Sequence, residues 1–555
     1  MNLKFTELLF LKGSSVIILD AKHIDHIYFD KVLSELITKM LLQNGSYNNN
    51  YIGGIMKICL IYPDNDKKCV DTGASCHLGI AYIASFLKKY GYPVDLYDCA
   101  PMQIKTNQMI KILSENKYDV IGLSAYIDNY AYVLRIVKYI KTFAKNTFIF
   151  IGGHLPSLAH DQIINDLDKI DCFVMGDGEL TTLHLIENLK KNKWKNTKGI
   201  VYKEGDCIIN TGPGTVIENI DEIPFPIRLK TQKKEIYILT SRGCVGNCSY
   251  CSVNSYSKNN SCSRIRKRSP ENIVEEIKEI TTTMDVETLN ICDDNFLIFD
   301  KDSKWFNRFF DLLLENNINL KYTIQTRVDS IEKNLDKLLQ WKELGLFRVF
   351  LGVESFVQKH LDYYNKNITV EQNLKAIKLL ENTGLDIMIG FMLFNPIIVL
   401  DDILETISFI RKNNLNKNTI INHELISSSY VIAYPGTPIA KDVQAKNCYS
   451  YNQRGYTILD KKSELCFQIM SRWNYEIYNI LDMDSIDIQL FDQQINIKST
   501  LFYQDLDLLE TVAKLLLQHD EFQSVNDFED ILQTYYKQVY AIKDRLIKID
   551  AIYKH

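Results

Sequence analysis

The sequence lacks any apolar run of the roughly 18 to 20 residues that a membrane-spanning helix needs, so no membrane span is expected. Its first segment has a short apolar stretch but no small-residue cleavage site, which argues against a signal peptide. Basic residues are not in excess, because 64 Lys and Arg stand against 69 Asp and Glu, for a formal net charge of −5. That balance disfavours general binding to nucleic acid or anionic membranes. These absences predict a cytoplasmic protein that binds neither nucleic acid nor membranes.

Several familiar nucleotide-binding and catalytic motifs are also absent. We find no Gly-x-Gly-x-x-Gly, which argues against a nicotinamide site, and no Walker loop, His-Glu-x-x-His or nucleophile-elbow Gly-x-Ser-x-Gly. There is no short-period repeat and no strong low-complexity tract. At 555 residues the chain is too long for one ordinary domain, and its length predicts about three or four.

The 13 cysteines do not form the pattern of a disulfide framework. Their number is odd, and most lie inside apolar runs such as KICLIYP and DCFVMG, which favours a reducing compartment. Three of them differ. Cys244, Cys248 and Cys251 lie in SRGCVGNCSYCSV, a loop rich in Gly, Ser and Asn, where thiolates can turn toward a metal.

The front part of the chain predicts an α/β domain. Residues 1–55 have a weak pattern and are predicted to be an N-terminal extension. From Met56, short apolar runs alternate with helical patterns, and a hairpin-like pair, GIVYKE and CIINTG, closes the unit. This alternation predicts a parallel, doubly wound, Rossmann-like sheet over residues 56–212. The following run, IENIDEIPFPIRLK, predicts a linker over residues 213–234.

A second series of six β–α units is expected over residues 235–440. Its predicted strands are IYILTS, TLNICDD, YTIQTR, RVFLGVES, DIMIGFMLF and INHELISSSYVIAY. Six units predict a partial (β/α)6 barrel rather than a closed eight-stranded one. Residues 441–555 are mostly helical in pattern and are predicted to form a C-terminal helical domain. The expected fold class is therefore α/β, with a Rossmann-like domain, a partial barrel and a helical domain in that order.

The three-cysteine loop follows the first predicted barrel strand, the position where such barrels carry their active sites. One interpretation is structural zinc, which takes four ligands, and the nearest candidate for the fourth is Cys262, ten residues beyond Cys251. The other is a cubane iron–sulfur cluster held by three thiolates, with one iron left open to bind a substrate. Gly243 and Gly246 would let the backbone curl around such a cluster.

The Cys-x3-Cys-x2-Cys spacing after a strand resembles the radical S-adenosylmethionine (radical SAM) enzymes, and residues 235 to about 440 resemble their core domain. The resemblance implies a [4Fe–4S] cluster held by Cys244, Cys248 and Cys251, whose fourth iron binds the amino and carboxylate groups of SAM. It also implies reductive cleavage of SAM to methionine and a 5′-deoxyadenosyl radical, which abstracts hydrogen from the substrate.

Further strand-end motifs resemble the same family. They are CDDNF (292–296), QTRVD (325–329), LGVES (351–355), GFMLFNP (390–396) and YPGTP (434–438). Where many relatives have Gly-Leu-Pro-Gly after the fifth strand, this chain has Phe-Asn-Pro-Ile at residues 394–397, which puts that backbone contact in doubt. The resemblance assigns SAM contacts to six residues: Tyr250 beside the adenine, Asp293 and Asp294 at the amino group, Arg327 near a carboxylate, and Glu354 and Ser355 at the ribose or methionine.

The α/β domain ahead of this core resembles the cobalamin-binding domain of the B12-dependent radical SAM enzymes. Loops after its third, fourth and fifth strands would contact cobalamin through Ser124, Gly152, Gly153, His154, Gly176, Gly178 and Glu179. Many such domains carry Asp-x-His-x-x-Gly after the second strand, with the histidine on cobalt, but YDCAPMQIK offers only Asp98. His77 and His154 are other candidate neighbours of the corrin. The alternative of a Rossmann-like domain that binds no cobalamin stays open.

The resemblance favours C-methylation of an unactivated carbon, in which methylcobalamin methylates a substrate radical and a second SAM restores the cofactor. One alternative is cyclisation or rearrangement of the substrate. A second is methylthiotransfer, which uses three further cluster cysteines in the front domain. A third is a metal-binding scaffold without catalytic activity. Expected partners are a small-molecule or peptide substrate and a reductant such as flavodoxin or ferredoxin. The sequence names no catalytic residue beyond the cofactor contacts, and it leaves the substrate, the oligomeric state and the role of residues 1–55 open.

Overall fold

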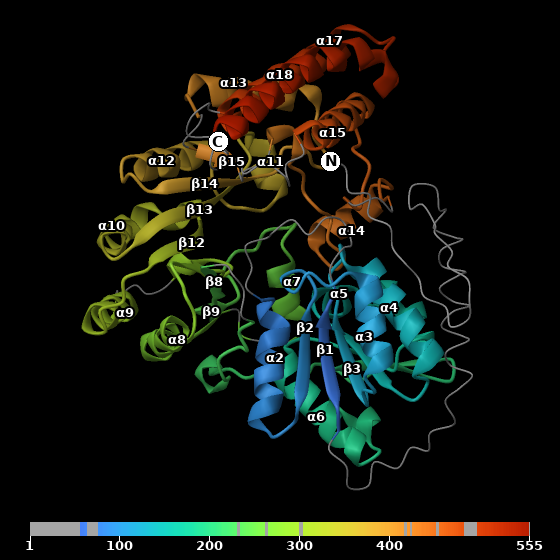
Figure 1. The fold of residues 1–555 in the computed structure, drawn as a ribbon. Coiled ribbons are helices and arrows are strands. Elements are labelled where there is room, and N and C mark those ends of the chain that lie inside the picture. Colours follow the sequence, from blue (N-terminus) through green and yellow to red (C-terminus); the bar gives the residue numbers. More distant parts are fainter. Residues whose placement is uncertain are drawn as a thin grey trace.

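The computed structural model describes residues 56–63, 76–229, 234–260, 263, 265–298, 304–415, 419–421, 425–450, 454–481 and 497–553 (Figure 1). The predicted N-terminal extension and Cys262 lie outside the described residues. The domain limits expected from the sequence stay predictions.

The front domain is built on one seven-stranded sheet with the order β2-β1-β3-β4-β5-β6-β7. Strands β1 to β5 pair in parallel, and β6 and β7 add an antiparallel pair, as the hairpin-like sequences predicted. Because both β2 and β3 pair with β1, the chain changes direction along the sheet there, which confirms the doubly wound fold. The bounds are β1 Ile58–Tyr62, β2 Val94–Asp98, β3 Val120–Ser124, β4 Phe148–Gly152, β5 Cys172–Val174, β6 Ile200–Glu204 and β7 Cys207–Asn210.

Helices cover both faces of this sheet. Alternate residues of β1 point to opposite faces, so Ile58 and Leu60 join one apolar core while Cys59 and Ile61 join the other. The first core is closed by α2 (Leu78–Lys89) and α6 (Gly178–Lys190), and the second by α3 (Thr106–Glu115) and α4 (Tyr130–Phe143) (Figure 1). A strand buried on both faces reads as a continuous apolar run, as KICLIYP does.

The second sheet has six strands in the order β15-β14-β13-β12-β11-β8, and every neighbouring pair is parallel, which confirms the partial barrel. Its strands are β8 Glu235–Ile238, β11 Thr288–Ile291, β12 Lys321–Arg327, β13 Leu346–Glu354, β14 Asp386–Phe391 and β15 Thr419–Ile421. Its covering helices are α8 Pro270–Thr283, α9 Lys304–Glu315, α10 Leu335–Glu343, α11 Gln358–Tyr363, α12 Val370–Glu381 and α13 Leu400–Lys412.

Two local features differ from the expected barrel. The sixth strand was predicted over 421–434, but β15 spans Thr419–Ile421 and residues 426–428 form a 3-10 helix, because this stretch mixes apolar residues with three consecutive serines. A short antiparallel pair, β9 (Ser241–Arg242) and β10 (Arg266–Lys267), also brackets the cysteine loop and the following helix α7 (Ser252–Asn259).

The described C-terminal part is helical, as predicted. It contains α14 (Pro438–Ala445), α15 (Lys461–Leu481), α17 (Ile497–Gln518) and α18 (Glu529–Tyr553). Helix α17 packs on α13 of the barrel and α15 packs on α18, so these helices extend the barrel core at the top of Figure 1. In the described residues, no helix is both long and apolar enough to cross a membrane.

Candidate functional site

A cavity of about 530 Å³ lies between the front domain and the first part of the barrel. It opens at the carboxyl ends of the front strands, at the point where β1 pairs with both β2 and β3, which is where ligands bind in doubly wound sheets. The front domain contributes all seven residues predicted to contact cobalamin: Ser124, Gly152, Gly153, His154, Gly176, Gly178 and Glu179. The barrel contributes residues of the cysteine loop and of the β11 end, among them Arg242, Gly243 and Asp294.

Two glycines of the front loops are required by close packing. Gly153 has φ +100°, and an added Cβ would lie 2.8 Å from the carbonyl oxygen of Ala125. Gly176 has φ +72°, and its Cβ would lie 2.9 Å from Oδ1 of Asn260, which ends the helix after the cysteine loop. The sequence predicted glycines that let the backbone approach a ligand closely. In the structure they also let these loops pack closely against other parts of the same chain.

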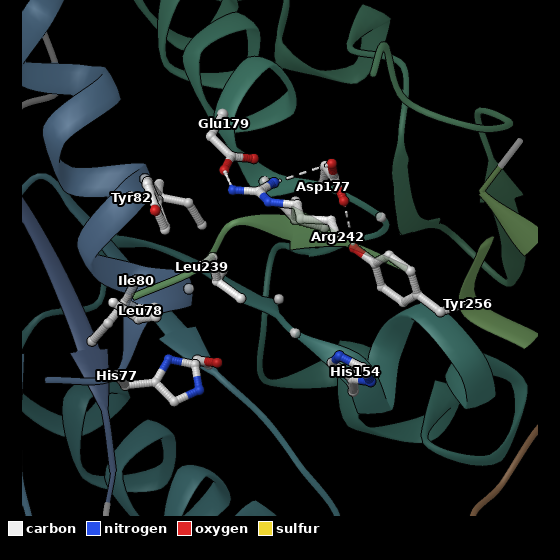
Figure 2. Close-up of a pocket in the computed structure, with 18 of the residues that line it drawn as sticks. His77, Leu78, Ile80, Tyr82, His154, Asp177, Glu179, Leu239, Arg242 and Tyr256 are labelled. Atoms are coloured by element: carbon white, nitrogen blue, oxygen red, sulfur yellow. Dashed lines mark hydrogen bonds and ion pairs between the residues drawn. The ribbon is translucent and has the colours of Figure 1, made fainter. Parts of the chain in front are cut away.

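Aromatic rings and two histidines form one side of the cavity (Figure 2). The His77 ring stacks on Tyr62 with centroids 4.0 Å apart, and the His154 ring lies 5.1 Å from both Tyr126 and Tyr256. Burial, and then the nearby His154, lower the pKa of His77 to about 4, and burial also lowers the pKa of His154. Both imidazoles are therefore neutral at pH 7, the form that binds metals.

An ion-pair network joins the two domains on the opposite side of the cavity (Figure 2). Arg242 of β9 donates to Glu179 at 2.6 Å and to Asp177 at 3.2 Å, while Arg266 of β10 donates to Asp177 at 2.6 Å. The Tyr256 hydroxyl donates to the same Asp177 carboxylate at 3.1 Å. Burial acts to raise the pKa of Asp177, but the two arginines outweigh it and hold that pKa below its usual value. The network fixes the cysteine loop against the front domain.

The cysteine loop connects β9 to α7 and carries three free thiols. Burial raises the pKa of Cys244, and it raises the pKa of Cys251 to about 11, so the thiolates are favoured only when a cation binds them. Gly243 has φ +94°, a backbone conformation that favours glycine in this loop, and a Cβ on Gly246 would lie 3.0 Å from Nη1 of Arg327, so a larger residue there would displace that side chain. Within the described residues, no three acidic, histidine or cysteine side chains already form a metal site. The donor set and the loop fit an iron–sulfur cluster that gathers the thiols when it binds.

The two aspartates after β11 have different environments. Asp293 is fully buried and accepts hydrogen bonds from the Thr240 amide at 2.7 Å, the Thr240 hydroxyl and the Ser241 hydroxyl at 2.6 Å. Burial raises its pKa to about 6, partly offset by these donors. Asp294 instead lines the cavity and accepts a hydrogen bond from the Gly243 amide at 3.0 Å. Of the predicted pair, only Asp294 faces the ligand space.

Arg327 and Glu354 belong to a network behind the cysteine loop. Arg327 donates to Asp329 at 2.9 Å, to the Lys366 carbonyl at 2.8 Å and to Sγ of Cys248 at 3.4 Å. Glu354 accepts from the buried Lys366 ammonium at 2.7 Å and has φ +70°, which is strained for a residue with a side chain. Burial, followed by the charge of Glu354, raises the pKa of Tyr250 well above its usual value. The network places positive charge beside the thiols.

Ser355 does not reach an open ligand space. Its side chain is only 1% exposed and lies 3.3 Å from Nδ1 of His360, and it accepts a hydrogen bond from the Val357 amide at 3.1 Å. His360 in turn lies 3.2 Å from Asp402. The hydroxyl closes the turn after β13, and the contact of Ser355 with the ribose or methionine of SAM stays a prediction.

Sequence reasoning missed four residues of the cavity wall: Arg242, Asp177, Tyr256 and Tyr126. Asp177 lies between the predicted contacts Gly176 and Gly178, and Arg242 lies inside the segment SRGCVGNCSYCSV, so the sequence already pointed to both loops. Their pairing could not be predicted, because 65 residues separate them along the chain.

The fold and the site define a two-domain class: a Rossmann-like domain whose strand ends face a three-cysteine loop at the start of a partial barrel. Residues 238–410 match the radical SAM superfamily, and residues 73–186 match the B12 binding domain. The chain therefore belongs to the cobalamin-dependent radical SAM enzymes, which use a [4Fe–4S] cluster, SAM and cobalamin.

Individual proteins of known sequence or structure resemble this chain. A Pyrococcus horikoshii protein named as an uncharacterized methyltransferase is 27% identical over 430 residues, covering 74% of this chain and 88% of that protein. The anaerobic magnesium-protoporphyrin IX monomethyl ester cyclase of Rubrivivax gelatinosus is also 27% identical, over 55% of this chain and 56% of its own length. The structure of the cobalamin-dependent SAM radical enzyme OxsB with aqua-cobalamin superposes with a TM-score of 0.71 at 18% identity, covering 93% of this chain and 86% of that one. The last similarity concerns the fold alone.

Proposed function

We propose that this enzyme is a cobalamin-dependent C-methyltransferase. The observation that supports it best is the shared cavity, because one space is bounded by the strand ends of the B12 domain and, on the radical SAM side, by Arg242 and Gly243 at the start of the cysteine loop and by Asp294. Methyl transfer to a carbon radical needs both cofactors to act on one substrate. The methyltransferase name of the Pyrococcus horikoshii relative supports the same reaction.

Each predicted group of residues has a task in this proposal. Cys244, Cys248 and Cys251 would hold the cluster, and the Arg327 guanidinium, 3.4 Å from Sγ of Cys248, would offset the negative charge of the thiolates. Asp294 would accept hydrogen bonds from the SAM ammonium, since its carboxylate lines the cavity. When bound, the cluster and SAM supply the radical, and cobalamin supplies the methyl group.

The front domain would hold cobalamin against this centre. The loops after β3, β4 and β5 line the cavity, and the Arg242–Glu179 and Arg266–Asp177 pairs fix them relative to the cysteine loop. Such fixing keeps the two cofactors at a constant separation and helps to exclude solvent from the site.

Methyl transfer can be tested without knowing the substrate. The protein would be reconstituted anaerobically with iron, sulfide and cobalamin, reduced, and given SAM that carries a CD3 methyl group. We expect the deuterated methyl on the protein-bound cobalamin, together with S-adenosylhomocysteine, and we expect 5′-deoxyadenosine from reductive cleavage. A protein that makes 5′-deoxyadenosine but never methylates its cobalamin is not a methyltransferase of this kind.

The second candidate is ring formation or rearrangement, favoured by the match to the cyclase of Rubrivivax gelatinosus. It predicts SAM consumption to 5′-deoxyadenosine alone. Methylthiotransfer predicts about twice the iron per chain, because it needs a second cluster. Against it, Cys59 is fully buried within β1, where it cannot hold iron without opening the strand. A scaffold without catalysis predicts no SAM cleavage at all.

The reductant, the location and the substrate class are proposed from the same chemistry. We propose flavodoxin or ferredoxin as reductant and the cytoplasm as location, since every described cysteine is a free thiol and a cluster of this kind needs reducing conditions. A small molecule or a peptide is the proposed substrate, and the helices after the barrel are the proposed determinant of its identity.

A further inference from the structure

The segment after β2 lacks a histidine, but a histidine from another part of the chain lies beside the end of this strand. Strand β2 ends at Asp98, and the residues that follow contain no histidine. In the fold, the Asp98 carboxylate accepts a hydrogen bond from the backbone amide of His77, which lies 21 residues earlier and directly precedes α2. Aspartate and histidine are thus neighbours in space, although no motif joins them in sequence.

The position of His77 suits a ligand at the floor of the cavity. His77 lines the cavity (Figure 2). Ser124 and Gly153, at the ends of the neighbouring strands β3 and β4, line it as well. One face of the His77 ring stacks on Tyr62, which ends β1, with an interplanar angle of 17°. The Tyr126 ring, after β3, lies at 70° to the imidazole, with the two ring centroids 5.7 Å apart. Two aromatic side chains therefore fix the plane of the imidazole before any ligand binds.

The ring of His77 has unused capacity to bind a ligand. Its Nδ1 is buried and has no hydrogen-bond partner among the described residues. A buried imidazole nitrogen without a partner costs free energy, which a metal or hydrogen-bonding ligand would recover. The backbone of His77 carries the structural contacts, namely the amide to Asp98 and the carbonyl to Ala81. The side chain is therefore not needed to build the loop.

His154 is the natural competitor, and its setting is different. It lines the same cavity, but its ring is stacked between Tyr126 and Tyr256, at interplanar angles of 19° and 22°. Tyr256 is itself anchored to Asp177 across the domain junction. Both faces of the His154 ring are thus in use between two tyrosines, which gives it a packing role at the junction.

We propose that His77 ligates the cobalt of the bound cobalamin through its imidazole. This inference rests on the cobalamin binding of the proposed function and adds to it a named protein ligand in a domain without the Asp-x-His-x-x-Gly motif. The two other coordination states are an open lower face and ligation by the benzimidazole of cobalamin itself.

Electron paramagnetic resonance of the protein loaded with cobalamin and reduced to cob(II)alamin distinguishes the three states. A nitrogen ligand splits the cobalt lines into triplets with ¹⁴N and into doublets with ¹⁵N. We expect triplets in the unlabelled protein and doublets in protein grown with ¹⁵N-histidine. Triplets that persist after labelling identify the benzimidazole, and unsplit lines identify an open face; either result overturns the inference.

Two variants assign the signal to one histidine. His77→Ala should lose the nitrogen splitting while it keeps bound cobalamin, and added imidazole should restore the splitting. His154→Ala, the matched control from the same cavity, should keep it. Splitting that survives in His77→Ala refutes the inference. A wild-type protein that takes up no cobalamin by absorbance refutes the proposed function as well, so the two failures can be told apart.

Discussion

Replacing Arg242 by methionine should weaken the junction between the two domains. Arg242 is largely buried and binds two carboxylates, and its loss would leave Glu179, whose side chain is 5% exposed, with no described ion-pair partner. Asp177 would keep Arg266 and Tyr256. The perturbation is therefore specific to one buried ion pair, and methionine preserves most of the apolar volume.

The magnitude follows from two opposing effects. Removing one partner of a buried ion pair costs about 3–5 kcal/mol, because the other charge stays buried. Glu179 lies in the first turn of α6, and the positive end of the helix dipole returns about 1 kcal/mol. We therefore expect Arg242→Met to lose about 3 kcal/mol, which for a domain of this size lowers the Tm of the front domain by about 6–12 °C.

The assay is thermal unfolding of the protein without its cofactors, under anaerobic reducing conditions. Arg308→Met is the matched control, because Arg308 also binds two glutamates, Glu271 at 2.7 Å and Glu315 at 3.2 Å, but is 44% exposed. Exposed pairs of this kind are screened by water and contribute little to stability. Adding Glu179→Gln to Arg242→Met should recover part of the loss. Equal Tm values for the two arginine variants would refute the reasoning.

Three further outcomes are expected. Cys248→Ala should abolish cluster uptake and 5′-deoxyadenosine formation, whereas Cys292→Ala, a thiol outside the loop, should retain both, as iron analysis and product chromatography will show. Gly153→Ala should destabilise the front domain more than Gly91→Ala in thermal unfolding, because both have positive φ but only the Cβ at Gly153 meets backbone. Asp505, fully buried in α17, has its pKa raised by burial from 3.8 to about 6, so its contribution should be greatest below pH 4 and fall by about 3 kcal/mol as the pH rises through 6. Asp505→Asn should remove that pH dependence of the Tm.

Opposite results have clear meanings. A cluster in Cys248→Ala would show that another side chain replaces this ligand, and loss of the cluster in Cys292→Ala would make the loop assignment non-specific. Equal effects of the two glycine changes would mean that backbone strain alone, and not the contact with Ala125, decides the cost. A pH slope that persists in Asp505→Asn would assign the titration to another group.

The succession of strands along the chain and the loop that carries the cluster cysteines could be predicted from local patterns. A strand buried on both faces must be apolar throughout, so KICLIYP and FIFIGGH mark β1 and β4 without any tertiary information. The cysteine spacing marks the loop, and the rule that parallel strands gather their carboxyl ends at one edge places Ser124 and Gly153 in the same cavity. What these signals share is that each depends on neighbouring residues only.

The side on which a motif residue points could not be predicted in this way. Asp293 and Asp294 are adjacent at the end of β11, and successive side chains of an extended strand point to opposite sides, so only one of the two can face the cavity. Which one does so depends on the pairing of β11 with β8, since that pairing brings Thr240 and Ser241 within hydrogen-bond distance of Asp293. Ser355 instead makes a local contact, with His360 five residues further on in the chain.

The contacts that complete the site depend on still longer-range order. The Asp98–His77 and Arg242–Asp177 contacts join residues 21 and 65 positions apart, and each requires a whole sheet to form first. A sequence motif can identify a metal ligand only where residues that are close in space are also close in the sequence, as the three cysteines are. In the front domain closeness in space and closeness in sequence do not coincide, because Asp98 ends β2 while His77, whose backbone amide donates to Asp98, precedes α2. The missing motif is therefore weak evidence against a protein ligand to cobalt, and the spatial neighbours of Asp98 are the better guide to where that ligand lies.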